Sequence, residues 1–108
     1  MLKVEVLDKN SYYYLSLVGE VDYNFEEDIK HKIEEIIIRP KDTVVSLEKV
    51  TYIDSVGITV MMYLMKNLAE KGNRMFFLKP DDAIRKVFAM TRLDKIIPVI
   101  EREEDINK

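Results

Sequence analysis

The chain has 108 residues, which fits one domain at about 100–200 residues per domain. Its 17 Lys and Arg against 20 Asp and Glu give a net charge of −3, which disfavours nucleic acid as a partner. The absence of Cys excludes a disulfide framework, a thiolate zinc site and a Cys nucleophile. No apolar run approaches the roughly 18–20 residues that cross a bilayer, and the N-terminus lacks the apolar stretch of a secretion signal. We therefore expect residues 1–108 to form a single cytoplasmic domain without a membrane partner. The 34% charged residues and the lack of Gln favour a heat-adapted source.

The N-terminal segment predicts a β-hairpin. Residues 2–7 alternate apolar and charged side chains, which is typical of a strand with one buried face. A turn-rich stretch at 8–11 is followed by aromatic and branched residues at 12–18, which predict the second strand.

The next segment predicts an amphipathic helix. Asn24 is expected to cap it, with Glu27 completing a capping box, and Pro40 is expected to end it. The apolar stripe recurs on a 3.6-residue period and consists of Phe25, Ile29, Ile33, Ile36 and Ile37.

The rest of the chain alternates strands and helices. Short apolar runs at 43–47 and 74–78 predict buried strands, and Pro98 makes 96–100 an edge strand. Helices are expected at 56–71, ended by Gly72, and after an opening at 80–82. The charged tail, 101–108, predicts either a helical turn or a frayed end. Together these elements predict an α/β fold. Its mixed sheet has four to five strands, is opened by the β-hairpin, and carries three to four packed helices.

One segment carries candidate chemistry. Asp54 and Ser55 stand where the second helix begins, and Gly57 falls inside its first turn. Gly costs about 0.5–1 kcal/mol in a helix relative to Ala, which indicates that another group comes close to the backbone there. A Ser at a helix start is suited to carry a phosphate, because the unpaired N–H groups and the dipole stabilise an anion. The alternative is that Asp54 or Ser55 is an ordinary N-cap.

The run Asp54-Ser55-Val56-Gly57-Ile58 resembles the signature of the STAS family, the anti-sigma factor antagonists. The resemblance extends over about residues 13–100. It includes the Gly-x-Val-Asp element that ends at Asp22, and a Gly, an apolar strand and a Pro at Gly72, 74–78 and Pro80. Two positions depart from the family pattern: Ser46 stands where an Asp is usual, and Val56 where Ser or Ala is frequent.

The resemblance implies a partner-switching function. Ser55 would be phosphorylated by a partner anti-sigma factor that is also a Ser/Thr kinase. The unphosphorylated protein would bind that partner and free the sigma factor, the phosphorylated form would dissociate, and a Ser/Thr phosphatase would reset it. Met61 belongs either to an adaptable apolar strip beside Ser55 or to the core. The expected partner-binding residues are Asp22, Asp54, Ser55, Val56, Gly57 and Met61.

Rival functions lack their residues. The single His, His31, lies on the outward side of a helix, so neither a hydrolase nor a metal site is expected, and no cofactor is implied. A phosphorelay receiver would need paired acids after its first strand, where Asp8 stands alone. A STAS module could also act as a non-switching scaffold or accessory subunit in a stress-sensing or transporter complex. Thr51 and Thr59 are secondary candidates for phosphorylation, and a monomer is expected.

Overall fold

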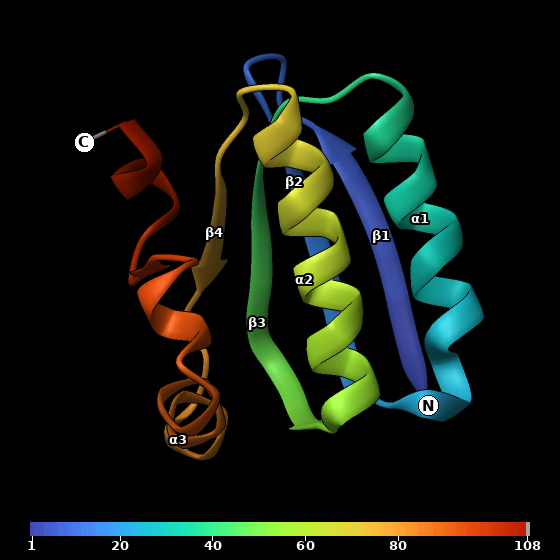
Figure 1. The fold of residues 1–108 in the computed structure, drawn as a ribbon, viewed down its shortest axis with the longest axis vertical. Coiled ribbons are helices and arrows are strands. Elements are labelled where there is room, and N and C mark those ends of the chain that lie inside the picture. The colour runs from blue at the N-terminus through green and yellow to red at the C-terminus, as the bar shows by residue number, and fades with distance from the viewer. Residues whose placement is uncertain (108) are drawn as a thin grey trace.

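The sheet has five strands. The computed structural model describes residues 1–107 and orders them β1-β2-β3-β4-β5 (Figure 1). The hairpin of β1 (Leu2–Asp8) and β2 (Tyr12–Val21) is antiparallel. The remaining strands, β3 (Asp42–Ile53), β4 (Met75–Leu78) and β5 (Val99–Ile100), continue parallel to β2. The predicted mixed sheet opened by a β-hairpin is confirmed.

Three α-helices connect the parallel strands. They are α1 (Glu26–Ile38), α2 (Ser55–Glu70) and α3 (Asp82–Thr91). Figure 1 shows α1 and α2 side by side on one face of the sheet. Strands that are added in sequential order through right-handed crossovers place their helices on the same face. Short 3-10 turns complete the chain: η1 (Tyr23–Phe25), η2 (Leu93–Lys95) and η3 (Glu103–Asn107).

Side chains cover both faces of the sheet, and one face is covered more extensively than the other. Buried residues of all three helices share one large core with alternate residues of the strands, such as Leu15 and Phe77. The opposite face carries a smaller cluster around Phe76, and this cluster is covered by Ile106 of η3. β4 is therefore buried on both sides, as its continuous apolar run predicts.

Three element boundaries differ from the prediction. Asn24 does not cap α1, because the chain first forms η1, and the residue before the helix, Phe25, makes no capping bond. β3 runs on to Ile53, beyond the predicted 43–47. Two register shifts against β2 interrupt the apolar pattern of its second half, and the prediction therefore stopped short. β5 keeps only two residues, and the preceding Pro98 contributes just its carbonyl, which accepts from Phe77 N at 2.9 Å.

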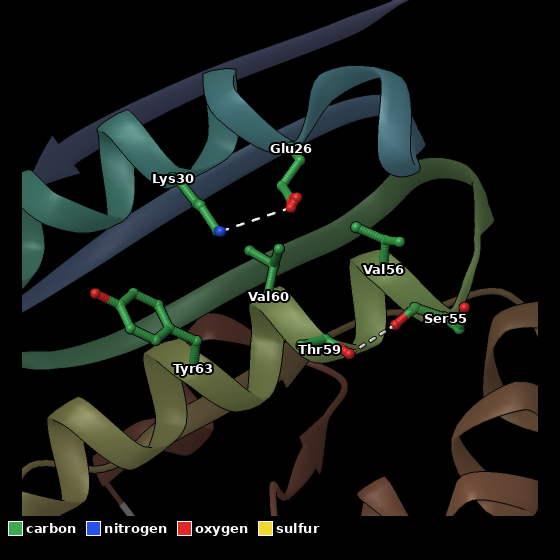
Figure 2. Close-up of a pocket in the computed structure, with 7 residues that line it drawn as sticks. All are labelled: Glu26, Lys30, Ser55, Val56, Thr59, Val60 and Tyr63. Carbon is green, nitrogen blue, oxygen red and sulfur yellow. Dashed lines mark hydrogen bonds and ion pairs between the residues drawn. The ribbon is translucent and has the colours of Figure 1, made fainter.

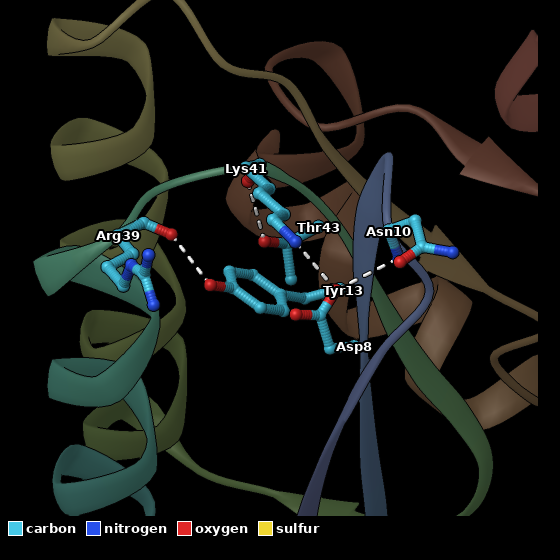
Figure 3. Close-up of polar contacts among 6 residues, drawn as sticks. All are labelled: Asp8, Asn10, Tyr13, Arg39, Lys41 and Thr43. Carbon is cyan, nitrogen blue, oxygen red and sulfur yellow. Dashed lines mark hydrogen bonds and ion pairs between the residues drawn. The ribbon is translucent and has the colours of Figure 1, made fainter.

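A polar cluster ties the hairpin to the loop between α1 and β3 (Figure 3). Lys41 Nζ lies 2.6 Å from Asp8 Oδ1, and this hydrogen bond lowers the pKa of Asp8. The Tyr13 hydroxyl donates to the carbonyl of Arg39 at 2.7 Å. Lys41 also lies over the Tyr13 ring, 5.0 Å from its centroid. These contacts hold the start of β3 against the hairpin.

Candidate functional site

Ser55 is the first residue of α2, and its side chain is exposed. Its backbone carbonyl accepts a hydrogen bond from Thr59 Oγ1 at 2.9 Å. Figure 2 shows the Ser55 hydroxyl on the side of the turn away from this bond. No residue in the described part of the chain hydrogen-bonds to that hydroxyl. The oxygen is therefore open to another protein.

Asp54 is the N-cap of α2. Its extended backbone (φ −108°, ψ −175°) turns the carboxylate back over the helix start, where Oδ1 accepts from Gly57 N at 2.9 Å. Its second oxygen, Oδ2, accepts from Tyr23 N at 3.2 Å. The alternative that Asp54 is an N-cap is thus confirmed, and because Asp54 fills this role, the hydroxyl of Ser55 is not used for capping.

Gly57 allows α2 to lie directly against the end of β2. A Cβ atom at this position would lie 2.4 Å from the Val21 carbonyl oxygen and 2.8 Å from Ile53 Cγ1. The predicted close approach to the backbone is therefore present, but the approaching group belongs to the chain itself and is not a ligand. Gly57 is buried, so it positions the helix and offers no contact surface.

The loop after β2 lies beside Asp54. Asp22 is only 8% exposed and its Oδ1 accepts from Asn24 N at 3.0 Å, so Asp22 shapes the turn and has little surface left for a partner. The next residue, Tyr23, is 68% exposed, and Tyr52 near the end of β3 is 51% exposed. Neither tyrosine was predicted as a site residue. For Tyr23, the available signal was an aromatic residue in the turn, outside the apolar stripe of the following helix.

A groove of about 310 Å³ runs between α1 and α2 and ends at Ser55 (Figure 2). On the α1 side of the groove, Lys30 Nζ forms an ion pair with Glu26 Oε1 at 3.5 Å. The Tyr63 hydroxyl donates to Glu34 Oε1 at 2.8 Å, and this bond raises the pKa of Tyr63. The residues that line the groove are Glu26, Lys30, Ser55, Val56, Thr59, Val60 and Tyr63. Of the residues expected to bind a partner, Val56 thus lies beside Ser55 and is partly accessible.

The prediction that Met61 contacts a partner is wrong. Its side chain is 0% exposed and belongs to the large core, whereas its neighbour Met62 is 37% exposed. The reason is the helix rotation: position 61 faces the sheet, as do Leu64 and Leu68. Ser46, which replaces the usual Asp of the family, is only 6% exposed.

Other kinds of site find no support in the described residues. No group of three or more His, Cys, Asp and Glu among residues 1–107 could hold a metal ion, and His31 is exposed. In the same part of the chain, no helix has both the length and the apolar character that a membrane span requires.

Two proteins of similar sequence are named anti-sigma factor antagonists. The anti-sigma F factor antagonist of Paenibacillus polymyxa is 25% identical, over 94% of this chain and 89% of that protein. The anti-sigma-B factor antagonist of Staphylococcus aureus (strain NCTC 8325 / PS 47) is 28% identical, over 95% of this chain and 96% of that protein. These names denote regulators rather than enzymes, in agreement with the sequence prediction.

Solved structures show the same fold. An anti-sigma factor antagonist from Mycobacterium paratuberculosis superposes with a TM-score of 0.87 at 21% identity, over 97% of this chain and 90% of that chain. The anti-sigma factor antagonist SpoIIAA in its unphosphorylated form gives 0.74 at 22% identity, over 99% and 94%. The family model described as STAS domain matches residues 3–106. This chain therefore belongs to the STAS domain family, and its named relatives are anti-sigma factor antagonists.

Proposed function

We propose that this protein is a cytoplasmic anti-sigma factor antagonist that works by partner switching at Ser55. Unphosphorylated, it binds an anti-sigma factor that is also a Ser/Thr kinase, and the sigma factor is released. Phosphorylation of Ser55 ends the binding, and a Ser/Thr phosphatase restores it.

The observation that carries this proposal is the free, exposed hydroxyl of Ser55 at the start of a 16-residue helix. Its two nearest rivals are both engaged. Thr59 Oγ1 donates to the Ser55 carbonyl at 2.9 Å, and Thr51 Oγ1 donates to the Gly19 carbonyl at 3.4 Å. Of these three Ser and Thr side chains, Ser55 therefore offers a Ser/Thr kinase the uncommitted hydroxyl.

The position also suits a switch that leaves the fold intact. A phosphate adds about −1.5 to −2 charges at pH 7. At Ser55 it would stand at the positive end of the α2 dipole, which stabilises an anion locally. In a closely packed interface the same charge must lose its hydration, so binding is weakened. Each loss of about 1.4 kcal/mol lowers affinity tenfold, so a few kcal/mol is sufficient.

The named relatives support the assignment. Two of them are antagonists of anti-sigma factors at 25% and 28% identity. SpoIIAA, which has the same fold, has been solved both unphosphorylated and phosphorylated. Phosphorylation is thus compatible with a folded protein of this architecture.

The test is phosphorylation by the kinase-type anti-sigma factor of the same organism with ATP, followed by mass spectrometry of the modified peptide. One phosphate is expected on Ser55. It should be absent in Ser55→Ala and retained in the controls Thr59→Ala and Thr51→Ala. Resistance to hydroxylamine distinguishes a serine ester from an acyl-phosphate on Asp54.

A binding assay completes the test. Ser55→Ala should bind the partner in the presence of ATP, and Ser55→Asp should bind weakly. Equal binding of wild type and Ser55→Asp, without phosphate on Ser55, would refute the switch and leave the non-switching scaffold as the better description.

A further inference from the structure

Three contacts join the turn after β2 to the start of α2. Asp54 N donates to the Val21 carbonyl at 3.3 Å. Asp54 Oδ2 accepts from Tyr23 N at 3.2 Å. The backbone at Gly57 lies so close to Val21 that a Cβ there would be 2.4 Å from the Val21 oxygen. The turn that carries Tyr23 and the start of α2 with Ser55 are therefore joined as one structural unit.

Within this unit, the Asp54 carboxylate has two separate tasks. One oxygen caps α2 through Gly57 N, and the other holds the backbone of Tyr23. The Tyr23 side chain is 68% exposed, so its ring projects to solvent from a backbone that is held in place. Tyrosine is enriched among the residues that dominate protein interfaces, because it offers a large contact area with few rotatable bonds.

We propose that Tyr23 is a second docking contact for the kinase-type anti-sigma factor and that Asp54 is the positioning residue that holds Tyr23 beside Ser55. The inference rests on the proposed function, because it takes the partner from it. A protein that covers the Ser55 hydroxyl also meets the turn bonded to Asp54. Tyr23 then anchors the partner in the unphosphorylated state, and Asp54 sets the spacing between the anchor and the phosphorylated residue.

The substitution Asp54→Asn separates the two tasks. The side-chain oxygen of Asn can still accept from Gly57 N, so the cap is kept. Its amide nitrogen only donates, so it cannot accept from Tyr23 N. Asp81→Asn is the matched control, because Asp81 caps α3 in the same way, by accepting from Ile84 N at 2.9 Å. Among the described residues, Asp81 has no side-chain bond to a second segment.

Affinity for the unphosphorylated partner complex is the main measurement. Tyr23→Ala is expected to weaken binding about tenfold, in the range of an interface anchor. Asp54→Asn should weaken it by several-fold, and Asp81→Asn should bind like wild type. The double variant Tyr23→Ala/Asp54→Asn should be no weaker than Tyr23→Ala alone, because Asp54 acts through Tyr23. Hydrogen exchange should show a faster Tyr23 amide in Asp54→Asn but not in Asp81→Asn.

Two results would overturn the inference. One is an affinity of Tyr23→Ala equal to that of wild type. The other is a loss of affinity in the double variant that equals the product of the losses in the two single variants. Tyr23→Ala removes an exposed ring and no hydrogen bond of the fold, so it remains informative even if Asp54→Asn is unstable. Ser55→Asp tells the two proposals apart. If it fails to bind while Tyr23→Ala and Asp54→Asn bind normally, the switch stands and only the docking contact is refuted.

Discussion

Replacing Gly57 with Ala tests how tightly the start of α2 is packed on the sheet. In an ordinary helix this change stabilises a protein by about 0.5–1 kcal/mol, because Ala is the better helix former. Here the added Cβ would lie 2.4 Å from the Val21 carbonyl oxygen and 2.8 Å from Ile53 Cγ1. The nearest atom belongs to the backbone and cannot rotate away, so the helix and β2 must separate.

The expected magnitude follows from these opposing effects. Inserting a methyl into a packed site costs about 1–3 kcal/mol, and the backbone contact puts this site in the upper half of that range. After the helix-propensity gain is subtracted, Gly57→Ala should lower the free energy of unfolding by about 1–2.5 kcal/mol. At about 4–8 °C per kcal/mol, the thermal midpoint should fall by about 4–20 °C.

Urea unfolding followed by circular dichroism measures the change. Ala69→Gly, at an exposed position of α2, gives the intrinsic helix effect and should cost about 1 kcal/mol. Gly72→Ala is a second control, because its φ of +77° strains Ala although no atom lies within 4 Å of the new Cβ. If Gly57→Ala is as stable as wild type or more stable, the close approach to Val21 does not constrain the fold and the reasoning fails.

Three further predictions concern stability and titration. Phe88→Ala removes a fully buried ring that stacks on the ring of Phe77 at a centroid distance of 4.4 Å. It should lower the free energy of unfolding by about 3–5 kcal/mol, measured in urea, and a loss below about 1 kcal/mol would contradict this. The bond from Lys41 lowers the pKa of Asp8, so the stability it contributes is present above the ordinary value of 3.8 and is lost as pH falls through the lowered pKa. Lys41→Met should remove this loss of stability from a plot of the free energy of unfolding against pH. A plot with the same shape as that of wild type would refute the prediction. The hydrogen bond to Glu103 raises the pKa of Tyr12 to about 12, so its stabilisation holds below pH 10 and declines as pH rises through 10 to about 12. Ultraviolet titration should show a tyrosine with a pKa of about 12, and Glu103→Gln should lower that pKa toward its ordinary value of 10.0.

The periodicity of the sequence predicted the architecture because each element follows a single burial pattern. The alternation in residues 2–7 and the stripe of isoleucines in α1 each match one buried face. The start of α1 was missed because Asn24 has the chemistry of a cap, while the chain uses Asp22 to begin a 3-10 turn first. Local propensity alone does not reveal which of two neighbouring caps the tertiary contacts select.

The site was predicted in part. Asp54, Ser55 and Gly57 carry signals of their own, namely a cap, a hydroxyl and a missing Cβ, so their places at the start of α2 followed from type and spacing. Met61 could not be separated from Met62, because α2 is apolar on nearly every side and its rotation is set by the sheet. The backbone of Tyr23 is bonded to Asp54 across 31 residues, and no local pattern records such a contact.

The strand pairings of the sheet are very unequal in length. β1 pairs with β2 over seven residues and β2 pairs with β3 over nine, whereas β3 pairs with β4 over only four residues and β4 pairs with β5 over two. The contacts that hold the start of α2 involve only residues 21–59, and none of them comes from the C-terminal segment 79–107. A change at an exposed position of residues 79–107, such as Met90 or Ile96, would therefore leave these contacts intact, whereas the buried side chains of the same segment, such as Phe88, have to be kept for the core.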